Sequence, residues 1–407
     1  MGVRRSPALW TAGAVYTVSA AVCCVLAART TAHFVDLQVY RMGGATVLHS
    51  DRLYQLRLTW LPFTYPPFAA VVFAALAVIP WKVAVAVLTG ASVVALPAAP
   101  YLVLRLSGPA RVQAGERAWT LALAVAAAAI WLEPARATLG YGQVDILLTA
   151  AVLYDLSLPD TARPKGVMIG LAAGIKLTPA IFAVYLLLTG RRRAAATAAA
   201  VFAGTVAAGF AVFPASSAWF WAGRFASPGH VSPVQNPQNQ SLYGALARVM
   251  HDADILPVWL VLAATVAVAG LALAATASRR GDEALGFSLC AVTGLLISPI
   301  SWIHHWVIVI PALLVIGLTA GRAYRAGNVA TALFAMAAIT AFAVTGWIEL
   351  AGETPRSGWL ALPAWALVRS VCYVLIGLAL LVAGAWSQAR SALSRATPGT
   401  AGQRGTA

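Results

Sequence analysis

The chain has 407 residues, of which 60% are hydrophobic and only 10% are charged. Soluble domains carry about 25% charged residues, so this composition excludes an ordinary soluble protein and indicates a protein of the bilayer. The formal net charge of +15 is typical of basic cytoplasmic loops, and no polar segment interleaves basic residues with aromatics as a nucleic-acid-binding surface would.

Apolar runs recur along the whole chain. We predict an all-α polytopic membrane protein with about twelve transmembrane helices, over residues 8–28, 68–104, 118–132, 143–158, 166–175, 178–190, 194–213, 255–277, 284–299, 303–320, 328–348 and 364–387. The run 68–104 is counted as one span, although it is long for one helix, and two helices are the alternative. The run 166–175 is short and can join 178–190 in one helix. The first run lacks a signal-peptidase site, so it is predicted to be retained.

The distribution of basic residues orients these helices. With both chain ends in the cytoplasm, most of the 28 Lys and Arg fall in inner loops, as the positive-inside rule requires. All six histidines and nearly all unusual polar stretches then face outward, so we expect a multi-pass plasma-membrane protein that functions on its outer side. Residues 1–387 are predicted to form one transmembrane domain, roofed by outer segments 29–67 and 214–254. Residues 388–407 are predicted to be a disordered cytoplasmic tail.

The first outer segment supplies three candidates. Residues 34–48 are amphipathic enough for a helix in the membrane interface, with Asp36 and Tyr40 four apart on one face. An ionisable residue at such a boundary is a functional candidate, although Asp36 can instead cap a helix. Tyr65, in TYPPF before the second span, is either a site residue or an interfacial belt aromatic.

Two motifs at later span boundaries carry opposite charges, a carboxylate in the first and a lysine in the second. GYGQVD (140–145) supplies Gln143 and Asp145, which can be helix caps, but a carboxylate this far into a span needs a partner or water. GIKLTP (174–179) puts Lys176 between two short apolar segments. Helix ends and an ammonium meeting at such a break form a natural anion site, with a snorkelling lysine as the alternative.

The last two motifs are NPQNQS (236–241) and SPISWIHHW (298–306). Asn239 and Gln240 suit sugar hydroxyls, whereas Ser241 can simply cap the next helix. His304 and His305 have no third ligand nearby in the sequence, and neighbours on a helix diverge, so we do not predict a metal site. They are expected to donate hydrogen bonds to a phosphate or sugar, one contacting it and the other bracing the first; a belt role is the alternative.

Convergence of these span ends would gather a carboxylate, a lysine, two histidines and several amides at one membrane surface. The carboxylate can accept a hydroxyl proton, and the cations can stabilise a leaving phosphate. This chemistry indicates glycosyl transfer from a lipid-phosphate sugar. A lipid-linked-sugar flippase is an alternative of another class, but it needs polar residues along the whole crossing path, and here they cluster on one side.

In order, the motifs DLQVY, FTYPP, GYGQVDILL, GVMIGLAAGIKLTP, NQSLYG and SPISWIHHWV resemble those of glycosyltransferase family 87, over roughly residues 30–320. The resemblance implies the GT-C fold of actinobacterial polyprenol-phosphate-mannose-dependent alpha-mannosyltransferases. It implies inverting transfer from beta-linked polyprenyl-phosphate mannose to a glycolipid acceptor at a periplasmic site. The similarity is greatest to members that add alpha-1,2-mannose to a phosphatidylinositol mannoside. Mannan-branching and arabinofuranosyl transfer remain alternatives.

The resemblance also implies residue roles. Asp36 corresponds to the catalytic base, and Lys176, His304 and His305 to the donor-phosphate contacts. The remaining candidates are assigned to the sugar or acceptor: Tyr40, Tyr65, Gln143, Asp145, Asn239 and Gln240. No cofactor is predicted, because lysine and histidine can stabilise the leaving phosphate themselves. A divalent ion bridging Asp36 and the phosphate is the alternative.

Overall fold

The computed structural model describes residues 6–29, 34–47, 49, 51–58, 61–107, 115–224, 233–325, 327–345 and 358–396. These residues are almost entirely helical, as predicted. In chain order the elements are α1 (Pro7–Ala28), α2 (Val35–Thr46), β1 (Arg57–Leu58), β2 (Leu61–Pro62), α3 (Pro67–Val78), α4 (Trp81–Leu106), α5 (Glu116–Ala129), α6 (Glu133–Tyr141), α7 (Asp145–Ser157), α8 (Val167–Ile175), η1 (Thr178–Ala180), α9 (Ile181–Leu188), α10 (Arg192–Val212), α11 (Pro214–Trp221), α12 (Leu242–Met250), α13 (Leu256–Arg279), α14 (Glu283–Ile297), η4 (Ile303–Val309), α15 (Ile310–Arg325), α16 (Val329–Thr345), α17 (Ala364–Ser370) and α18 (Cys372–Ala396), where η marks a 3-10 helix.

Six helices of the described chain are long and apolar enough to cross a membrane, or seven if α5 and α6 form one bent span. They are α1, α4, α10, α13, the continuous η4–α15 and α18. This confirms a multi-pass architecture but not the predicted total of twelve. Helices α7, α8 and α9 have 13, 9 and 8 residues, whereas a span needs about 20.

Several predicted spans are divided. The run 68–104 forms two helices, α3 and α4, because Ile79 is extended before Pro80 and a residue preceding proline disfavours the helical region. The run 364–387 is divided at Val371 into α17 and α18. Helix α18 continues to Ala396, into the segment that was predicted to be a disordered tail, and residues 397–407 lie outside the described part of the chain.

Helix α6 was not predicted. It follows α5 after a bend of 78°, begins with Glu133 and Pro134, and ends at Tyr141, capped by Gly142, whose φ is 70°. Proline fits the first turn of a helix and glycine fits a left-handed cap, so both ends are locally specified. The bend delivers the chain to the turn from which α7 starts.

Helix α14 lies at the centre of the bundle. Twelve of its 15 residues are buried, against α13, α18, α15 and α9. Helix α13 approaches closely because Gly270 faces Thr293, and a Cβ at position 270 would lie 2.1 Å from the Thr293 hydroxyl oxygen. Small residues permit such close packing between membrane helices. On its other side α13 exposes Val261 and Val268, as expected for contact with lipid.

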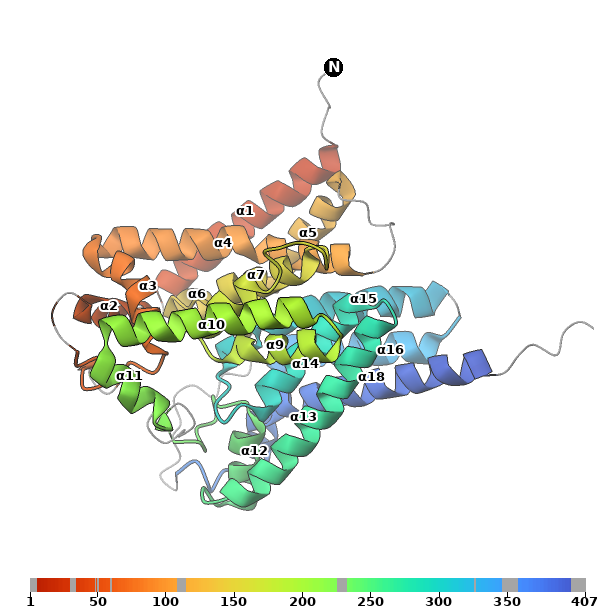
Figure 1. Ribbon diagram of the computed structural model, residues 1–407. Helices are drawn as coiled ribbons and strands as arrows, with labels where there is room; N and C mark the ends of the chain where they lie inside the picture. The colour runs from red at the N-terminus through yellow and green to blue at the C-terminus, as the bar shows by residue number, and fades with distance from the viewer. Residues whose placement is uncertain are drawn as a thin grey trace, which may run out of the picture.

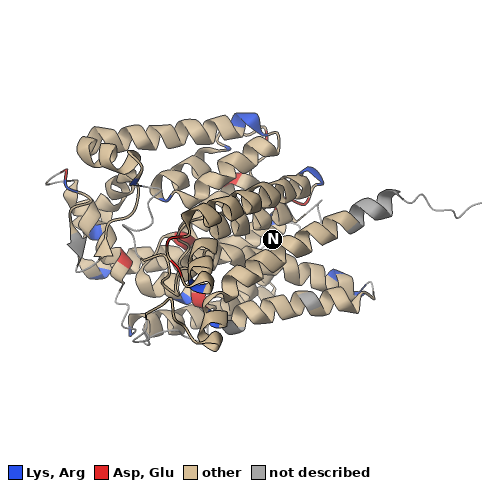
Figure 2. Ribbon diagram, turned by 90° about the horizontal axis from the view of Figure 1, so that it is seen from below, with Lys and Arg blue, Asp and Glu red and all other residues tan. Residues whose placement is uncertain are grey.

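Three of the short helices gather at one end of the molecule. Figure 1 shows α2, α3 and α11 together at that end, beside the tips of α4 and α10. The amphipathic segment predicted over 34–48 is helical, as α2. Figure 2 shows that charged residues are sparse and that the bundle is mostly uncharged. The few buried charges therefore mark positions where specific partners are required.

Candidate active site

The N-terminus of α2 is fixed against the turn between α6 and α7. Phe34 has a left-handed backbone with φ of 54°, and its N–H donates to the carbonyl oxygen of Gly140 at 3.0 Å. A Cβ at Gly142 would lie 2.8 Å from the Cβ of Leu37. A left-handed backbone at a non-glycine residue such as Phe34 costs free energy, so it persists only where the surrounding structure enforces it. The docking places Asp36, on the first turn of α2, beside the start of α7.

Gln143 connects the groups at this junction. Its side-chain oxygen accepts hydrogen bonds from the hydroxyls of Tyr40 and Tyr65, the latter at 3.1 Å, and the two hydroxyls are themselves 3.0 Å apart. Its side-chain nitrogen donates to Asp36 and lies 3.1 Å from Nε2 of His304. The structure therefore brings three predicted sugar contacts into one buried cluster with the predicted base.

The environment of Asp36 raises the pKa of its carboxyl group. Burial raises the pKa of the Asp36 carboxyl from 3.8 to about 6. The Gln143 hydrogen bond and the Lys176 ammonium oppose this rise, and the Asp145 carboxylate adds to it. A carboxylate whose pKa lies near neutral pH is a better proton acceptor than one with the usual pKa, because a base is most effective when its pKa approaches the working pH.

Lys176 and Asp145 form a buried ion pair. The Lys176 Nζ atom donates to Oδ1 of Asp145 at 2.6 Å, and both side chains are about nine-tenths buried. Lys176 ends α8, and η1 and α9 follow it, so the predicted break between two short apolar helices is confirmed. Asp145 is the first residue of α7. The carboxylate predicted to need a partner is thus paired with the lysine predicted to bind an anion.

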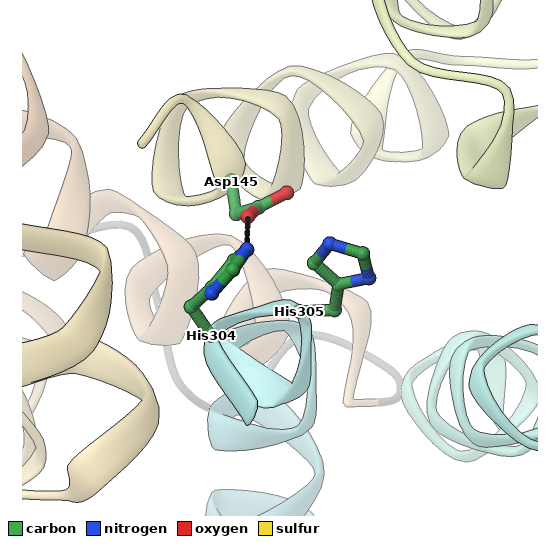
Figure 3. A group of neighbouring side chains, drawn as sticks. All are labelled: Asp145, His304 and His305. Atoms are coloured by element: carbon green, nitrogen blue, oxygen red, sulfur yellow. Dashed lines mark ion pairs between the residues drawn. The ribbon is translucent and has the colours of Figure 1, made fainter. Parts of the chain in front are cut away.

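The two histidines lie on η4, against α6 and α7. Their ring centroids are 4.7 Å apart and the rings are nearly perpendicular. Figure 3 shows His304 reaching toward Asp145, with His305 beside it; Nε2 of His304 lies 4.0 Å from Oδ2 of Asp145. His304 is buried and His305 is partly exposed. Oδ2 of Asp145 and Nδ1 of His305 are buried atoms without a hydrogen-bond partner.

These three residues also have the composition of a metal site. One ligand atom from each of Asp145, His304 and His305 lies within 4.8 Å of the others. The sequence argument that the histidines lack a third ligand is therefore wrong, because packing of η4 on α7 supplies Asp145. Two imidazoles and a carboxylate suit a transition metal. The Lys176 ammonium on Asp145 and the Gln143 amide on His304 compete for the same ligand atoms.

The amides of the second outer segment bind backbone. The Asn239 amide donates to carbonyls of Val234 and Pro299 and accepts from the N–H of Ser301. The Gln240 amide donates to carbonyls of Pro237 and Ser370. The bonds of Asn239 to Pro299 and Ser301 clamp the SPIS loop, which ends three residues before His304. The alternative that Ser241 caps a helix is confirmed, because its hydroxyl accepts from the N–H of Gly244 at the start of α12.

Arg248 is the principal site-supporting residue that sequence reasoning missed. Its side chain is fully buried on α12 and donates to the carbonyl oxygens of Asn236, Asn239 and Ser370. Burial lowers the pKa of the Arg248 guanidinium to about 9. An arginine inside the otherwise apolar nonamer LYGALARVM was the available signal, since an uncompensated charge is rarely buried.

A sequence profile described as glycosyltransferase family 87 matches residues 63–299, which include Gln143, Asp145 and Lys176. The chain belongs to glycosyltransferase family 87. Membership makes it a glycosyltransferase and confirms the family that the motifs resemble.

Family 87 relatives cover most of the chain. The polyprenol-phosphate-mannose-dependent alpha-(1-2)-phosphatidylinositol mannoside mannosyltransferase of Mycobacterium tuberculosis is 32% identical over 394 residues, 90% of each chain. The corresponding enzyme of Mycolicibacterium smegmatis is 33% identical over 84% of this chain and 83% of its own. A phosphatidylinositol pentamannoside mannosyltransferase of M. tuberculosis is 36% identical over 74% of this chain and 70% of its own.

A solved structure also aligns with the chain. It is ArnT from Cupriavidus metallidurans bound to undecaprenyl phosphate, which covers 92% of this chain and 77% of its own, with 16% identity and a TM-score of 0.42.

Proposed function

We propose that this family 87 enzyme transfers mannose, with inversion, from polyprenyl-phosphate mannose to a mannosylated phosphatidylinositol, forming an alpha-1,2 linkage on the outer side of the plasma membrane. The observation that carries the proposal is the meeting of Asp36 with Lys176, His304 and His305 around Gln143 and Asp145. The names of the relatives, which specify this donor and class of acceptor, support it.

Asp36 acts as the general base. The acceptor hydroxyl attacks the anomeric carbon from the face opposite the phosphate, while the carboxylate removes the hydroxyl proton. The new carbon–oxygen bond forms as the bond from the anomeric carbon to the phosphate oxygen breaks, and polyprenyl phosphate leaves with the bonding electrons. The raised pKa of Asp36, about 6, leaves the base ionised at neutral pH and strengthens it.

Lys176, His304 and His305 form the donor-phosphate side of the site. Charge develops on the leaving phosphate, and preorganised cationic and N–H donors stabilise it most in a poorly solvated site. Asp145 holds the Lys176 ammonium in place through one of its three N–H groups, so the others remain available in principle to a phosphate. The polyprenyl chain would lie among the bilayer lipids.

The sugar and acceptor contacts remain predictions. Asn239 holds the loop before His304, Gln240 binds the carbonyl oxygen of Ser370, and Tyr40 and Tyr65 donate to Gln143. We propose that these residues shape the walls of the sugar site, and that Asp145, which has an unpartnered oxygen, is the strongest candidate for direct contact with a hydroxyl.

We propose that turnover needs no metal. Any ion held by Asp145, His304 and His305 would have to displace Lys176 and Gln143 from two ligand groups. Purified enzyme incubated with a strong chelator should keep its turnover. Loss on chelation, restored by one divalent ion and abolished by His305→Ala, would assign a metal role to this group.

The deciding experiment uses purified protein in liposomes. Polyprenyl-phosphate mannose is supplied with phosphatidylinositol carrying increasing numbers of mannoses, and the product linkage is identified with an alpha-1,2-specific mannosidase and by NMR. Transfer to one acceptor in alpha-1,2 linkage is expected. Transfer only from polyprenyl-phosphate arabinofuranose would show that the donor sugar is arabinofuranose and not mannose. Transbilayer movement of the lipid without glycosidic bond formation would show that the protein is a flippase and not a transferase.

The side of the membrane is tested separately. Supplying the donor and acceptor to sealed vesicles of known orientation should give product only when both lipids reach the outer leaflet. Product formed from the cytoplasmic leaflet alone would reverse the proposed orientation.

A further inference from the structure

The Gln143 side chain has all its hydrogen-bonding groups engaged. Its oxygen accepts from Tyr40 and Tyr65, and its nitrogen faces Asp36 and His304. The residue is 3% exposed. An amide has two acceptor lone pairs and two N–H donors, so these four neighbours use its full capacity. Gln143 thus has no group left for a sugar hydroxyl.

Only one orientation of this amide suits its neighbours. Burial holds the pKa values of both phenols well above their usual range, so Tyr40 and Tyr65 remain protonated and can donate. With the amide reversed, its oxygen would face the Asp36 carboxylate, and two acceptors would meet without a proton between them. The nitrogen of Gln143 therefore points at Asp36 and His304.

This orientation determines the state of His304. Because the Gln143 nitrogen donates, Nε2 of His304 must accept, and the ring is neutral with its proton on Nδ1. The same tautomer explains why Nε2 stays 4.0 Å from Oδ2 of Asp145. Both atoms are then acceptors, and the contact is not an ion pair. It also accounts for Oδ2 having no partner.

His305 differs from its neighbour. No described group hydrogen-bonds to its ring; Nδ1 is buried without a partner, and the side chain is partly exposed, unlike that of His304. Lys176 lies close enough to both rings to interact with them electrostatically. An unused imidazole N–H beside a lysine is suited to a phosphate oxygen.

We propose that Gln143 is the positioning residue of this site: it holds Asp36 in place and fixes His304 as an acceptor, so that His305 is the histidine that donates to the donor phosphate. This inference rests on the proposed function and assigns roles within it. It changes Gln143 from a sugar contact to a positioning residue. Of the two histidines first assigned to the donor phosphate, it keeps that contact for His305 and gives His304 a supporting role.

The sharpest variant is Gln143→Glu, which keeps the shape and the acceptor for both tyrosines. It removes the N–H donated to Asp36 and adds a nearby carboxylate, so Asp36 holds its proton to higher pH. The rising limb of kcat/KM against pH should move up by about one unit, a tenfold loss of rate below the limb. The other titratable groups around Asp36 are unchanged in this variant, and they are Lys176, Asp145, Tyr40, Tyr65 and His304.

Gln240→Glu is the matched control. Gln240 is also a buried amide, 2% exposed, but it donates to backbone carbonyls of Pro237 and Ser370. Its substitution should destabilise the fold while the pH limb stays in place. A limb that moves equally in both variants, or in neither, would overturn the positioning role of Gln143.

The roles of the two histidines are distinguished by whether a substitution changes KM for the donor or kcat. His305→Phe removes a donor to the phosphate and should raise the KM for polyprenyl-phosphate mannose at least tenfold. His304→Phe should lower kcat, and His304→Gln should recover much of it, because an amide oxygen can accept from Gln143. The reverse pattern, with His304 controlling the donor KM, would overturn the assignment.

One measurement does not depend on turnover. Nitrogen-15 NMR of histidine-labelled wild-type protein should show a neutral ring with an unprotonated Nε2. The loss of this signal in His304→Gln would assign it to His304. A protonated Nε2 on His304 would contradict the inference even if mannosyl transfer is confirmed. Conversely, the expected tautomer with no mannosyl transfer would fault the proposed function instead.

Discussion

The two segments predicted to roof the site, 29–67 and 214–254, use their polar residues in different ways. The first places a carboxylate and two phenols in contact with the side chain of Gln143, in the turn before α7. The second directs its amides and Arg248 mainly to backbone carbonyls. A carbonyl needs only a donor, so amides satisfy it without reactive chemistry. The first segment therefore carries the reactive group, and the second sets the position of the histidine loop.

The largest effect is expected from the first segment. Asp36→Asn removes the base and should lower transfer by about 10³-fold or more, measured as mannose incorporated from polyprenyl-phosphate mannose. Because the folded pKa of Asp36, about 6, exceeds the unfolded value of 3.8, its ionisation costs stability as pH rises between these values. The variant should thus unfold at a higher temperature than wild type at pH 7.

A control for this prediction lies in the same segment. The Asp51 carboxylate accepts from the backbone N–H groups of Ala215 and Ser216 at the start of α11. Asp51→Asn should lower the unfolding temperature and leave turnover within a few-fold of wild type. Similar turnover in the two Asn variants would remove the distinction between reactive and structural carboxylates in this segment.

The next effect concerns the Lys176–Asp145 ion pair, whose ammonium lies over the ring of Tyr65 in the first segment. Lys176→Gln should lower turnover about 10²-fold, because the leaving phosphate loses a cation, and it leaves Asp145 as an unpaired buried charge that costs about 3–5 kcal/mol of stability. Pairing it with Asp145→Asn should restore most of the stability, measured by thermal unfolding, without restoring transfer. Recovery of activity in the double variant would show that the pair is structural.

A smaller effect is expected from pH alone. Since Asp36 must be ionised to accept a proton, kcat/KM should fall about tenfold for each pH unit below about 6. The limb should be absent from the residual activity of Asp36→Asn. A limb retained in that variant would assign the titration to another group.

The smallest effect on turnover is expected in the second segment. Arg248→Met leaves the carbonyls of Asn236, Asn239 and Ser370 without this donor, at about 1–3 kcal/mol for each group that stays unsatisfied. The unfolding temperature should fall, while transfer by the protein that remains folded stays within about tenfold. A far larger loss of transfer with unchanged stability would give the second segment a direct catalytic role.

The fold was predictable where periodicity and composition act locally. The helical class, the helix over 34–48 and the break at Lys176 all follow from apolar runs, proline and glycine. The number of spans did not follow, because an apolar segment buried in protein and one exposed to lipid have the same composition. Helices α7 and α8 are mostly of the first kind, whereas α9 also exposes Val184 and Leu187; all three are shorter than the roughly 20 residues of a span.

The site was predictable as a set of residues and not as a set of contacts. Asp36, Lys176 and the histidines were identified from their unfavourable placement in apolar surroundings. Asp145 and Gln143 were identified too, but their pairing with Lys176 and His304 was not, since these residues come from elements distant in the chain. The dismissal of a metal-like cluster failed for the same reason: the third ligand is a neighbour in space only.

The sequence by itself determined that this chain is a helical membrane protein and, through motifs that match family 87, a glycosyltransferase. Both conclusions depend only on residues that are close together in the sequence. Only the tertiary structure decided which polar groups face reacting atoms and which are consumed in holding the fold. Hydrogen-bond capacity is finite, so the role of an amide such as Gln143 depends on which neighbours packing brings to it.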